Sequence, residues 1–515
     1  NRTRGVGGTT QSYFSFDPDY VTLDTGSGTQ TNYSYKGADA LSSLIGRLDY
    51  NYDDRYLLSA TIRRDGSSRF LNEQYGWFPA VSVGWNIWNE SFAPETDWLN
   101  DLKVRGGYGV MGNQLNVDPS NAFTTFGGDQ LNSFYAIGGN NSTITEGFRQ
   151  TRIGNPDAEW EKNVNFNIGL DASLFNSAVQ VTADYYRKDI NDLLFNPNLP
   201  ATVGTATVPF VNAAKMTNSG FDIDISTYFN LTDDLRLNTS LTLTTYNNEI
   251  VKIADGVPYF DQEGRRFNGS NIIRNAPGHS LSQFFGYQTA GFWNSQAEID
   301  DANAAAQAAT GDANAVYQSD VAVGRFRYAD TNGDNRITSE DRTFLGNPNP
   351  DFTYGINIEL LYKNWDFSMF LYGSQGNDIW NNVKWWTDFY SGFTGAKSKT
   401  ALYDSWTPTN MNASAPIQQT TGSFSLADVP NSYFVEDGSY LRAKQIQLGY
   451  SLPSSLLDTM NITKLRLYVQ MVNAFTITSY SGIDPEISGG TTNFGIDEGA
   501  YPNQAQLLLG LNLIF

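Results

Sequence analysis

Apolar and polar residues alternate with a period of two along much of this chain. Residues 234–247 are the clearest case, because leucines fill one side of the alternation while arginine, asparagine, serine and threonine fill the other. The last residues, QLLLGLNLIF, repeat the pattern and end on Phe515. Alternation of this kind predicts β-strands with one apolar and one polar face. Thirteen such spans are predicted, at residues 41–51, 55–64, 78–88, 101–111, 162–174, 178–188, 218–229, 234–247, 350–362, 365–374, 438–452, 462–473 and 506–515.

The connections between these spans are of two kinds. Short turns occupy residues 52–54, 175–177, 230–233, 363–364 and 453–461, with a somewhat longer one at 89–100. Long loops occupy residues 65–77, 112–161, 189–217, 248–349, 375–437 and 474–505. Because the two kinds alternate, all the short turns fall at one end of the sheet, as in outer-membrane barrels with short periplasmic turns and long extracellular loops. We therefore expect residues 1–40 to be an extracellular loop and residues 41–515 to form a transmembrane antiparallel β-barrel.

One strand-like segment, residues 278–289, does not fit this alternation, since counting it would place the turn at 363–364 on the wrong side. We expect it to lie inside the extracellular loop 248–349 without crossing the membrane. The alanine-rich segment 297–310 predicts a short helix in the same loop. An odd number of antiparallel strands cannot close on itself, and bacterial single-chain barrels have even numbers of strands. The spans should therefore be part of a larger barrel.

Several long motifs resemble one known family. They are GRLDYNYDDRYLLSATIRRDGSSRF (46–70), WFPAVSVGWNIWNESF (77–92), GRFRYADTNGDNRITSEDRTFLGNPNPDFTYGINIEL (324–360), LRAKQIQLGYSLP (441–453) and the terminal LNLIF. From about residue 41 onward, the chain is similar to the SusC/RagA family of TonB-dependent outer-membrane transporters of Bacteroidota. The resemblance implies a 22-stranded barrel around a plug domain. The predicted spans would be its last strands, and the plug domain and the earlier strands would lie outside this chain.

The same resemblance implies a function without covalent chemistry. The expected activity is TonB-dependent import of a nutrient, an oligosaccharide or a peptide, across the outer membrane of a Gram-negative bacterium. The expected partners are a SusD-like surface lipoprotein that covers the outer mouth, TonB acting through the plug region, and outer-membrane lipid. A dimer of such transporter–lipoprotein pairs is a further expectation.

Composition excludes several other classes of protein. The net charge of −21 disfavours nucleic acid as a partner, because nucleic acid requires basic patches. The chain has no cysteine and a single histidine, His279, which excludes disulfides, thiolate metal sites and sites built from several histidines. No apolar run is long enough for a membrane-spanning helix, so any crossing of a membrane requires closed strands.

The segment DTNGDNRITSED, residues 330–341, is similar to the calcium loops of EF-hands and dockerins. Calcium prefers six to eight hard oxygen ligands in a flexible loop. The predicted ligands are the side chains of Asp330, Asn332, Asp334 and Asp341 and the carbonyl of Arg336. Ile337 would anchor the loop to a core. Two positions depart from the pattern, namely Asn335 in place of glycine and Asp341 in place of glutamate, and the alternative is a polar turn without a metal.

Aromatic residues cluster in NDIWNNVKWWTDFYSGF, residues 377–393, within a long extracellular loop. Trp380, Trp385, Trp386 and Tyr390 are the candidate contacts for a substrate or for the lid, because aromatic rings stack on sugars and grip peptide side chains. The alternative is that these rings form the core of the loop itself.

Two other classes of protein remain open from the sequence. One is a soluble, calcium-dependent glycan-binding all-β protein, and the other is an all-β glycoside hydrolase. The 54 acidic residues do not single out a catalytic carboxylate pair. A barrel wall requires detergent for extraction, whereas either alternative would purify without it.

Overall fold

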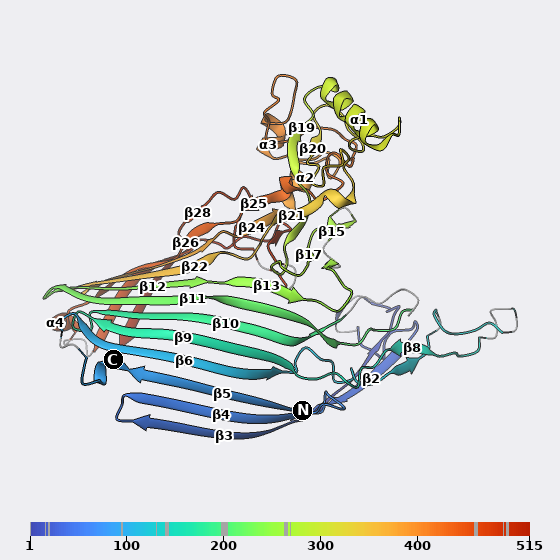
Figure 1. The fold of residues 1–515 in the computed structure, drawn as a ribbon. Helices are drawn as coiled ribbons and strands as arrows, with labels where there is room; N and C mark the ends of the chain where they lie inside the picture. The colour runs from blue at the N-terminus through green and yellow to red at the C-terminus, as the bar shows by residue number, and fades with distance from the viewer. Residues whose placement is uncertain are drawn as a thin grey trace.

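Thirteen strands that follow one another along the chain form a single antiparallel sheet in the computed structural model (Figure 1). The structure describes residues 2–15, 17–18, 21–93, 96–129, 131–137, 139, 144–196, 204–261, 266–267, 269–457, 462–487, 489–490 and 494–515. The strands are β3 (Leu41–Tyr52), β4 (Tyr56–Ser67), β5 (Tyr75–Asn86), β6 (Leu99–Asn113), β9 (Glu161–Leu174), β10 (Val179–Phe195), β11 (Val211–Thr232), β12 (Leu235–Thr245), β22 (Phe352–Tyr362), β23 (Trp365–Gln375), β26 (Tyr440–Ser451), β27 (Lys464–Val472) and β30 (Gln506–Ile514). Every predicted span is one of these strands, so the predicted all-β fold is confirmed.

Some strand boundaries differ from those predicted. β11 begins at Val211, well before the predicted residue 218. Its first half pairs with a short strand, β13 (Asn247–Lys252), and its second half pairs with β12. Another short strand, β28 (Thr476–Thr478), pairs with the first residues of β26. The sheet therefore extends beyond the alternating spans at the end where the long loops leave it.

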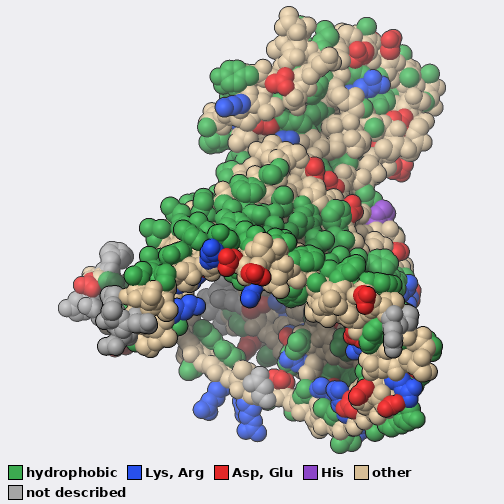
Figure 2. Space-filling view, turned by 90° about the vertical axis from the view of Figure 1, so that its left-hand side faces the viewer, with side chains coloured by type: hydrophobic (Ala, Val, Ile, Leu, Met, Phe, Trp, Pro, Cys, Tyr) green, Lys and Arg blue, Asp and Glu red, His purple; other side chains and the backbone are tan. Residues whose placement is uncertain are grey.

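The register gives the sheet one apolar and one polar face. Ile225, Leu241, Ile356 and Leu371 are successive cross-strand partners on β11, β12, β22 and β23. The next row of cross-strand partners points to the opposite face, and it contains the polar residue Thr242 of β12. Large apolar side chains of the first face are exposed, and Leu509 on β30 is 82% exposed. Figure 2 shows hydrophobic side chains over a broad part of the wall, with charged side chains gathered beside the open space beneath it.

The sheet is open along both edges. Among the residues that the structure describes, β3 pairs only with β4 and β30 pairs only with β27. The thirteen strands therefore do not close on themselves, which agrees with the parity argument. Residues 1–40, expected as a loop, carry a hairpin of β1 (Arg2–Thr9) and β2 (Thr31–Ala38) at the end of the sheet opposite the short turns (Figure 1).

Connections of different length lie at opposite ends of the sheet (Figure 1). Several short turns use left-handed backbone, with φ of 54° at Asp53, 55° at Asn176 and 51° at Lys363. Asparagine and aspartate accept this conformation more readily than most other residues. The short α4 (Ser454–Leu457) lies among these turns, whereas β7 (Thr125–Gly127) and β8 (Arg149–Arg152) lie in a long loop at the other end.

Parts of the long loops 248–349, 375–437 and 474–505 fold together into one body, here called the loop module (Figure 1). Its strands are β14 (Phe260–Asp261), β15 (Arg266–Phe267), β16 (Ser270–Asn271), β17 (Arg274–Asn275), β18 (Phe284–Tyr287), β19 (Thr289–Phe292), β20 (Phe326–Tyr328), β21 (Arg342–Gly346), β24 (Asp378–Asn381), β25 (Val435–Asp437) and β29 (Ile496–Asp497). Its helices are α1 (Gln296–Thr310), α2 (Val383–Thr387) and α3 (Lys399–Tyr403). The predicted helix at 297–310 is α1, and β18 of the segment 278–289 pairs with β21, outside the main sheet.

The loop module has an aromatic core of its own. Trp293, Trp380, Phe284, Tyr328 and Phe434 are all fully buried, and they belong to one cluster to which all three loops contribute. Hydrogen bonds join distant segments, as between Trp406 Nε1 and Asn294 Oδ1 at 2.8 Å. The three loops are thus a folded unit. Within the described part of the chain, none of the helices is long and apolar enough to cross a membrane.

Candidate functional site at the junction of the wall and the loop module

Charged residues on the polar face of the sheet are paired across strands. Arg105 on β6 binds Asp171 on β9 at 3.0 Å and Asp184 on β10 at 2.5 Å. Gly169 lies between them, and a Cβ atom there would approach Asp184 Oδ1 to 2.4 Å and Arg105 Cζ to 2.8 Å. The absence of a side chain at Gly169 therefore lets this ion pair lie flat on the wall.

A second ion pair repeats this arrangement at the other side of the sheet. Arg466 on β27 binds Asp366 on β23 through its Nε at 2.9 Å and also through Nη2. Gly449 on the intervening strand β26 lies beneath the pair, since a Cβ atom there would be 2.5 Å from Arg466 Nη2. Both pairs join three neighbouring strands and neutralise charge on the polar face.

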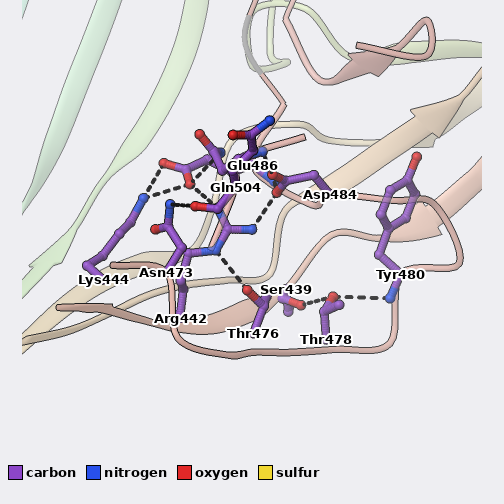
Figure 3. Close-up of polar contacts among 11 residues, drawn as sticks. Ser439, Arg442, Lys444, Asn473, Thr476, Thr478, Tyr480, Asp484, Glu486 and Gln504 are labelled. Atoms are coloured by element: carbon purple, nitrogen blue, oxygen red, sulfur yellow. Dashed lines mark hydrogen bonds and ion pairs between the residues drawn. The ribbon is translucent and has the colours of Figure 1, made fainter. Parts of the chain in front are cut away.

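The most buried ionic cluster lies where β26 meets the last long loop (Figure 3). Arg442 donates to Asp484 at 2.5 Å, to Glu486 at 2.5 Å and to Thr476 Oγ1 at 2.8 Å. Lys444 Nζ binds both carboxylate oxygens of Glu486, at 2.7 and 2.6 Å. The Arg442 side chain is only 4% exposed. We call this cluster the latch and the loop 474–505 the strap.

A β-bulge in β26 lies at the latch. The pairing of β26 with β23 shifts register between Phe370 and Leu371, which leaves Lys444 as an extra residue on β26. Such a bulge changes which face a side chain points to. Arg442 and Lys444 both reach Glu486. A bulge has no signature in the alternating pattern, so the sequence argument did not identify the latch.

Asp484 is the anionic centre of the latch. Burial raises the pKa of its carboxyl group, but the hydrogen bond from Arg442 and those from the backbone amides of Glu486 and Asn503 outweigh it, so the net pKa is lowered. The two amides donate at 2.9 and 2.8 Å. The carboxylate is therefore held in its charged form and joins Arg442 to two parts of the strap, at Glu486 and at Asn503.

The strap is also tied to the loop module. Its Ile496 lies in the module core, and its β29 pairs with β24. Trp380 N donates to Gly495 O at 2.8 Å. Tyr480 Oη donates to Asp497 Oδ2 at 2.7 Å, and burial raises the pKa of this tyrosine. The strap thus connects the latch on the wall to the core of the module.

The four aromatic residues predicted as substrate or lid contacts fall into two groups. Trp380 is 0% exposed and stacks on Phe434 with ring centroids 5.4 Å apart. It therefore has no free surface for a ligand, and the prediction is wrong for this residue in the described conformation. Trp380 fits the alternative interpretation, in which the aromatic rings form the core of the loop itself. Trp385 is half-buried, with Nε1 donating to Ala427 O at 3.0 Å.

The other two candidates lie at the surface of the module. Trp386 is 47% exposed, and Tyr390 is partly exposed. Lys397 supports this surface, because its ammonium group donates to the carbonyls of Trp386 at 2.9 Å, Phe389 at 3.0 Å and Phe393. Burial lowers the pKa of Lys397. We call Trp386, Tyr390 and the exposed Phe393 the aromatic surface.

The predicted calcium loop is closed by its own amides. Asp330 accepts from the backbone N–H groups of Gly333 and Asn335, each at 2.7 Å. Asp341 is fully buried and accepts from Thr331 N at 2.9 Å and Thr338 N at 2.7 Å. These contacts form a polar turn with two left-handed residues, Gly333 with φ of 78° and Asn335 with φ of 62°.

The remaining predicted ligands of the loop are also engaged locally. Asn332 Oδ1 accepts from Asp334 N, and Asp334 Oδ1 accepts from Arg336 N. Ile337 is buried in the module core, as expected. In the described residues, no group of three or more histidine, cysteine, aspartate or glutamate side chains is arranged to hold a metal ion. Calcium binding by this loop stays a prediction.

Replacing Asp341 with alanine should loosen this loop. The substitution leaves the amides of Thr331 and Thr338 without their acceptor, at a cost of about 1–3 kcal/mol. Hydrogen exchange of residues 329–341 measures the effect, and Glu340→Ala, at an exposed neighbour, is the control with little change. The calcium prediction adds that a chelator speeds exchange in the same segment of the unmodified protein. Unchanged exchange after chelation would contradict it.

The fold and its charged face together define a class of protein. A sheet with an exposed apolar face, a polar face carrying cross-strand ion pairs, short turns at one end and long loops at the other is the wall of an outer-membrane β-barrel. A family model described as "TonB dependent receptor-like, beta-barrel" matches residues 2–336. The chain belongs to this family of outer-membrane receptors, so its apolar face is the lipid-facing side of the wall.

Individual relatives agree with this assignment. TonB-dependent receptor P3 of Formosa agariphila is 31% identical, over 98% of this chain and 48% of that protein. TonB-dependent receptor SusC of Bacteroides thetaiotaomicron is 29% identical, over 94% of this chain and 44% of that protein. The chain thus spans about half the length of the curated relatives it matches. The predicted likeness to SusC is confirmed.

A solved structure has the same fold. The RagAB peptide transporter superposes with a TM-score of 0.79 at 22% sequence identity, covering 99% of this chain and 52% of that one. The expected likeness to both SusC and RagA is therefore found in the comparisons of sequence and of structure.

Proposed function

We propose that the receptor containing this chain imports a nutrient, an oligosaccharide or a peptide, across the outer membrane in a TonB-dependent manner. The observation that carries the proposal is the latch, which fastens a folded extracellular module to the polar side of a membrane wall. In this proposal the module forms the outer mouth, and the polar face lines the path that a hydrophilic substrate follows. TonB acts through parts of the receptor outside this wall.

A SusD-like surface lipoprotein is the proposed partner at the mouth. The aromatic surface suits such a contact, because aromatic rings combine large contact area with few lost rotamers. Its position on the module, supported by Lys397, is the reason to assign it to the lid. A dimer of transporter–lipoprotein pairs is part of the same proposal. The name of the RagAB transporter states a peptide substrate for that protein, and for this chain peptide and oligosaccharide are both proposed.

Copurification and uptake test this proposal in the native bacterium. The whole receptor with Trp386→Ala and Phe393→Ala should copurify several-fold less lipoprotein than the unmodified receptor does. The control is Phe126→Ala, which removes an exposed aromatic from a different loop. Growth on peptides and on oligosaccharides as sole sources identifies the substrate class, and deletion of TonB should abolish both uptake and growth. Uptake that persists without TonB would contradict the proposal.

The alternative of a soluble calcium-dependent glycan-binding protein leaves the exposed apolar face without a role. Phe221 and Leu509 are more than half exposed on that face, and water is an unfavourable environment for both. Extraction decides between the two, because the proposed transporter requires detergent and a soluble lectin does not.

A further inference from the structure

The lipid-facing side of the sheet has a hollow of about 540 Å³ over β4, β5, β6 and β9. Tyr50, Leu58, Val83, Trp85, Phe166 and Ile168 are among the residues that line it. The lining is almost wholly apolar, so the hollow is a poor site for water.

A single missing side chain accounts for the hollow. Leu58, Val83, Gly106 and Ile168 are successive cross-strand partners, which places the glycine in the middle of an apolar row. A Cβ atom at Gly106 would have Asn167 O at 3.7 Å and Val83 Cγ2 at 3.9 Å, which are ordinary contacts. The backbone is thus not crowded at this position, and side chains larger than hydrogen fit there.

The rim of the hollow marks the membrane–water boundary at the short-turn end. Tyr56 Oη and Trp85 Nε1 both donate to Glu90 Oε1, at 2.5 and 2.9 Å, and the Glu90 side chain is only 7% exposed. Arg55 pairs with the same carboxylate at 3.4 Å. Tyrosine and tryptophan with anchored polar tips are typical of the girdles of membrane barrels. The hollow therefore extends from this girdle toward the hydrocarbon.

We propose that the hollow binds one acyl chain of a phospholipid from the leaflet at the short-turn end. It is an indentation in the surface that already faces lipid, and its walls match a hydrocarbon chain and little else. Because the surrounding lipid is also apolar, the acyl chain prefers the hollow through close packing rather than through loss of water. The aromatic rings of Tyr50 and Phe166 give the chain rigid walls, and the girdle places its headgroup at the interface. The inference rests on the membrane location of the sheet and not on import.

Photo-crosslinking tests the site in the whole receptor. The receptor is reconstituted into phosphatidylethanolamine vesicles that contain a small fraction of phosphatidylethanolamine with a diazirine in its acyl chain. After illumination, mass spectrometry should find several-fold more label on β5, β6 and β9 than on the equally apolar outer face of β12 and β22. Even labelling of the whole lipid-facing surface, or no label in the hollow, would overturn the proposal.

Two variants connect the label to the hollow. Gly106→Leu fills the hollow and should remove the excess label. Gly46→Leu is the matched control on the same face, where a Cβ atom would have Ile62 Cγ2 at an ordinary 3.6 Å, and it should keep the excess. If Gly106→Leu does not fold, Val83→Phe fills the hollow from the neighbouring strand. Excess label that survives filling would also overturn the proposal.

Discussion

Replacing Arg442 with methionine should release the strap from the wall. The substitution leaves Asp484 buried without its cation, and removal of one partner from a buried pair costs about 3–5 kcal/mol. We expect hydrogen exchange in residues 479–487 and 494–505 to rise by orders of magnitude, while exchange in β22 and β23 stays unchanged. Nutrient uptake by cells that carry the variant receptor should also fall.

The control for this substitution is Arg47→Met. Arg47 also pairs with an aspartate, Asp49, at 2.8 Å, but both side chains are well exposed. Exposed pairs contribute only about 0–1 kcal/mol. Equal effects of the two substitutions would contradict the role of the latch.

Acid should weaken the latch in the same way. The native pKa of Asp484 is lowered, so the charged form contributes stability above the ordinary aspartate pKa of about 3.9. That contribution declines as the pH falls through the lower native value. Strap exchange should therefore be constant at neutral pH and rise only under strongly acidic conditions.

The second large effect is expected at Trp380, whose replacement with alanine should unfold much of the loop module. Trp380 packs against Phe267, Phe284 and Phe434, and truncation of a buried tryptophan costs about 3–5 kcal/mol. Limited proteolysis should cut the module at several sites, whereas heat-dependent mobility of the barrel in gels stays unchanged.

Trp386→Ala is the matched control, because Trp386 belongs to the same segment and is about half exposed. It should leave the module resistant to protease and affect lid binding alone. If Trp386→Ala loosens the module as strongly as Trp380→Ala, the division into core and surface residues is wrong.

The wall could be predicted from the sequence because its signal is local. Lipid on one side and water on the other impose a period of two on every crossing strand, and turns interrupt that period at short intervals. The pattern in residues 234–247 became β12, and the parity of the turns correctly excluded residues 278–289 from the sheet. The start of β11 was missed because its first half lies outside the alternating region.

The loop module and the latch could not be predicted in this way. The core brings together residues from three loops, so no local period reveals that Trp380 is buried while Trp386 is exposed. Arg442 and Lys444 could be seen as cations within an apolar strand. Their partners Asp484 and Glu486 lie in a separate loop with many other acidic residues, and only the fold selects them.

Accessibility of single cysteines tests the central claim most directly, because this chain has no cysteine of its own. Asp233→Cys places a thiol in a short turn, and Ala313→Cys places one after α1 in the loop module, both at exposed positions. In intact cells, a membrane-impermeant maleimide should label the receptor with Ala313→Cys and leave the one with Asp233→Cys unlabelled until the outer membrane is opened. Labelling of Asp233→Cys in intact cells would contradict a wall that crosses the membrane with its short turns inside.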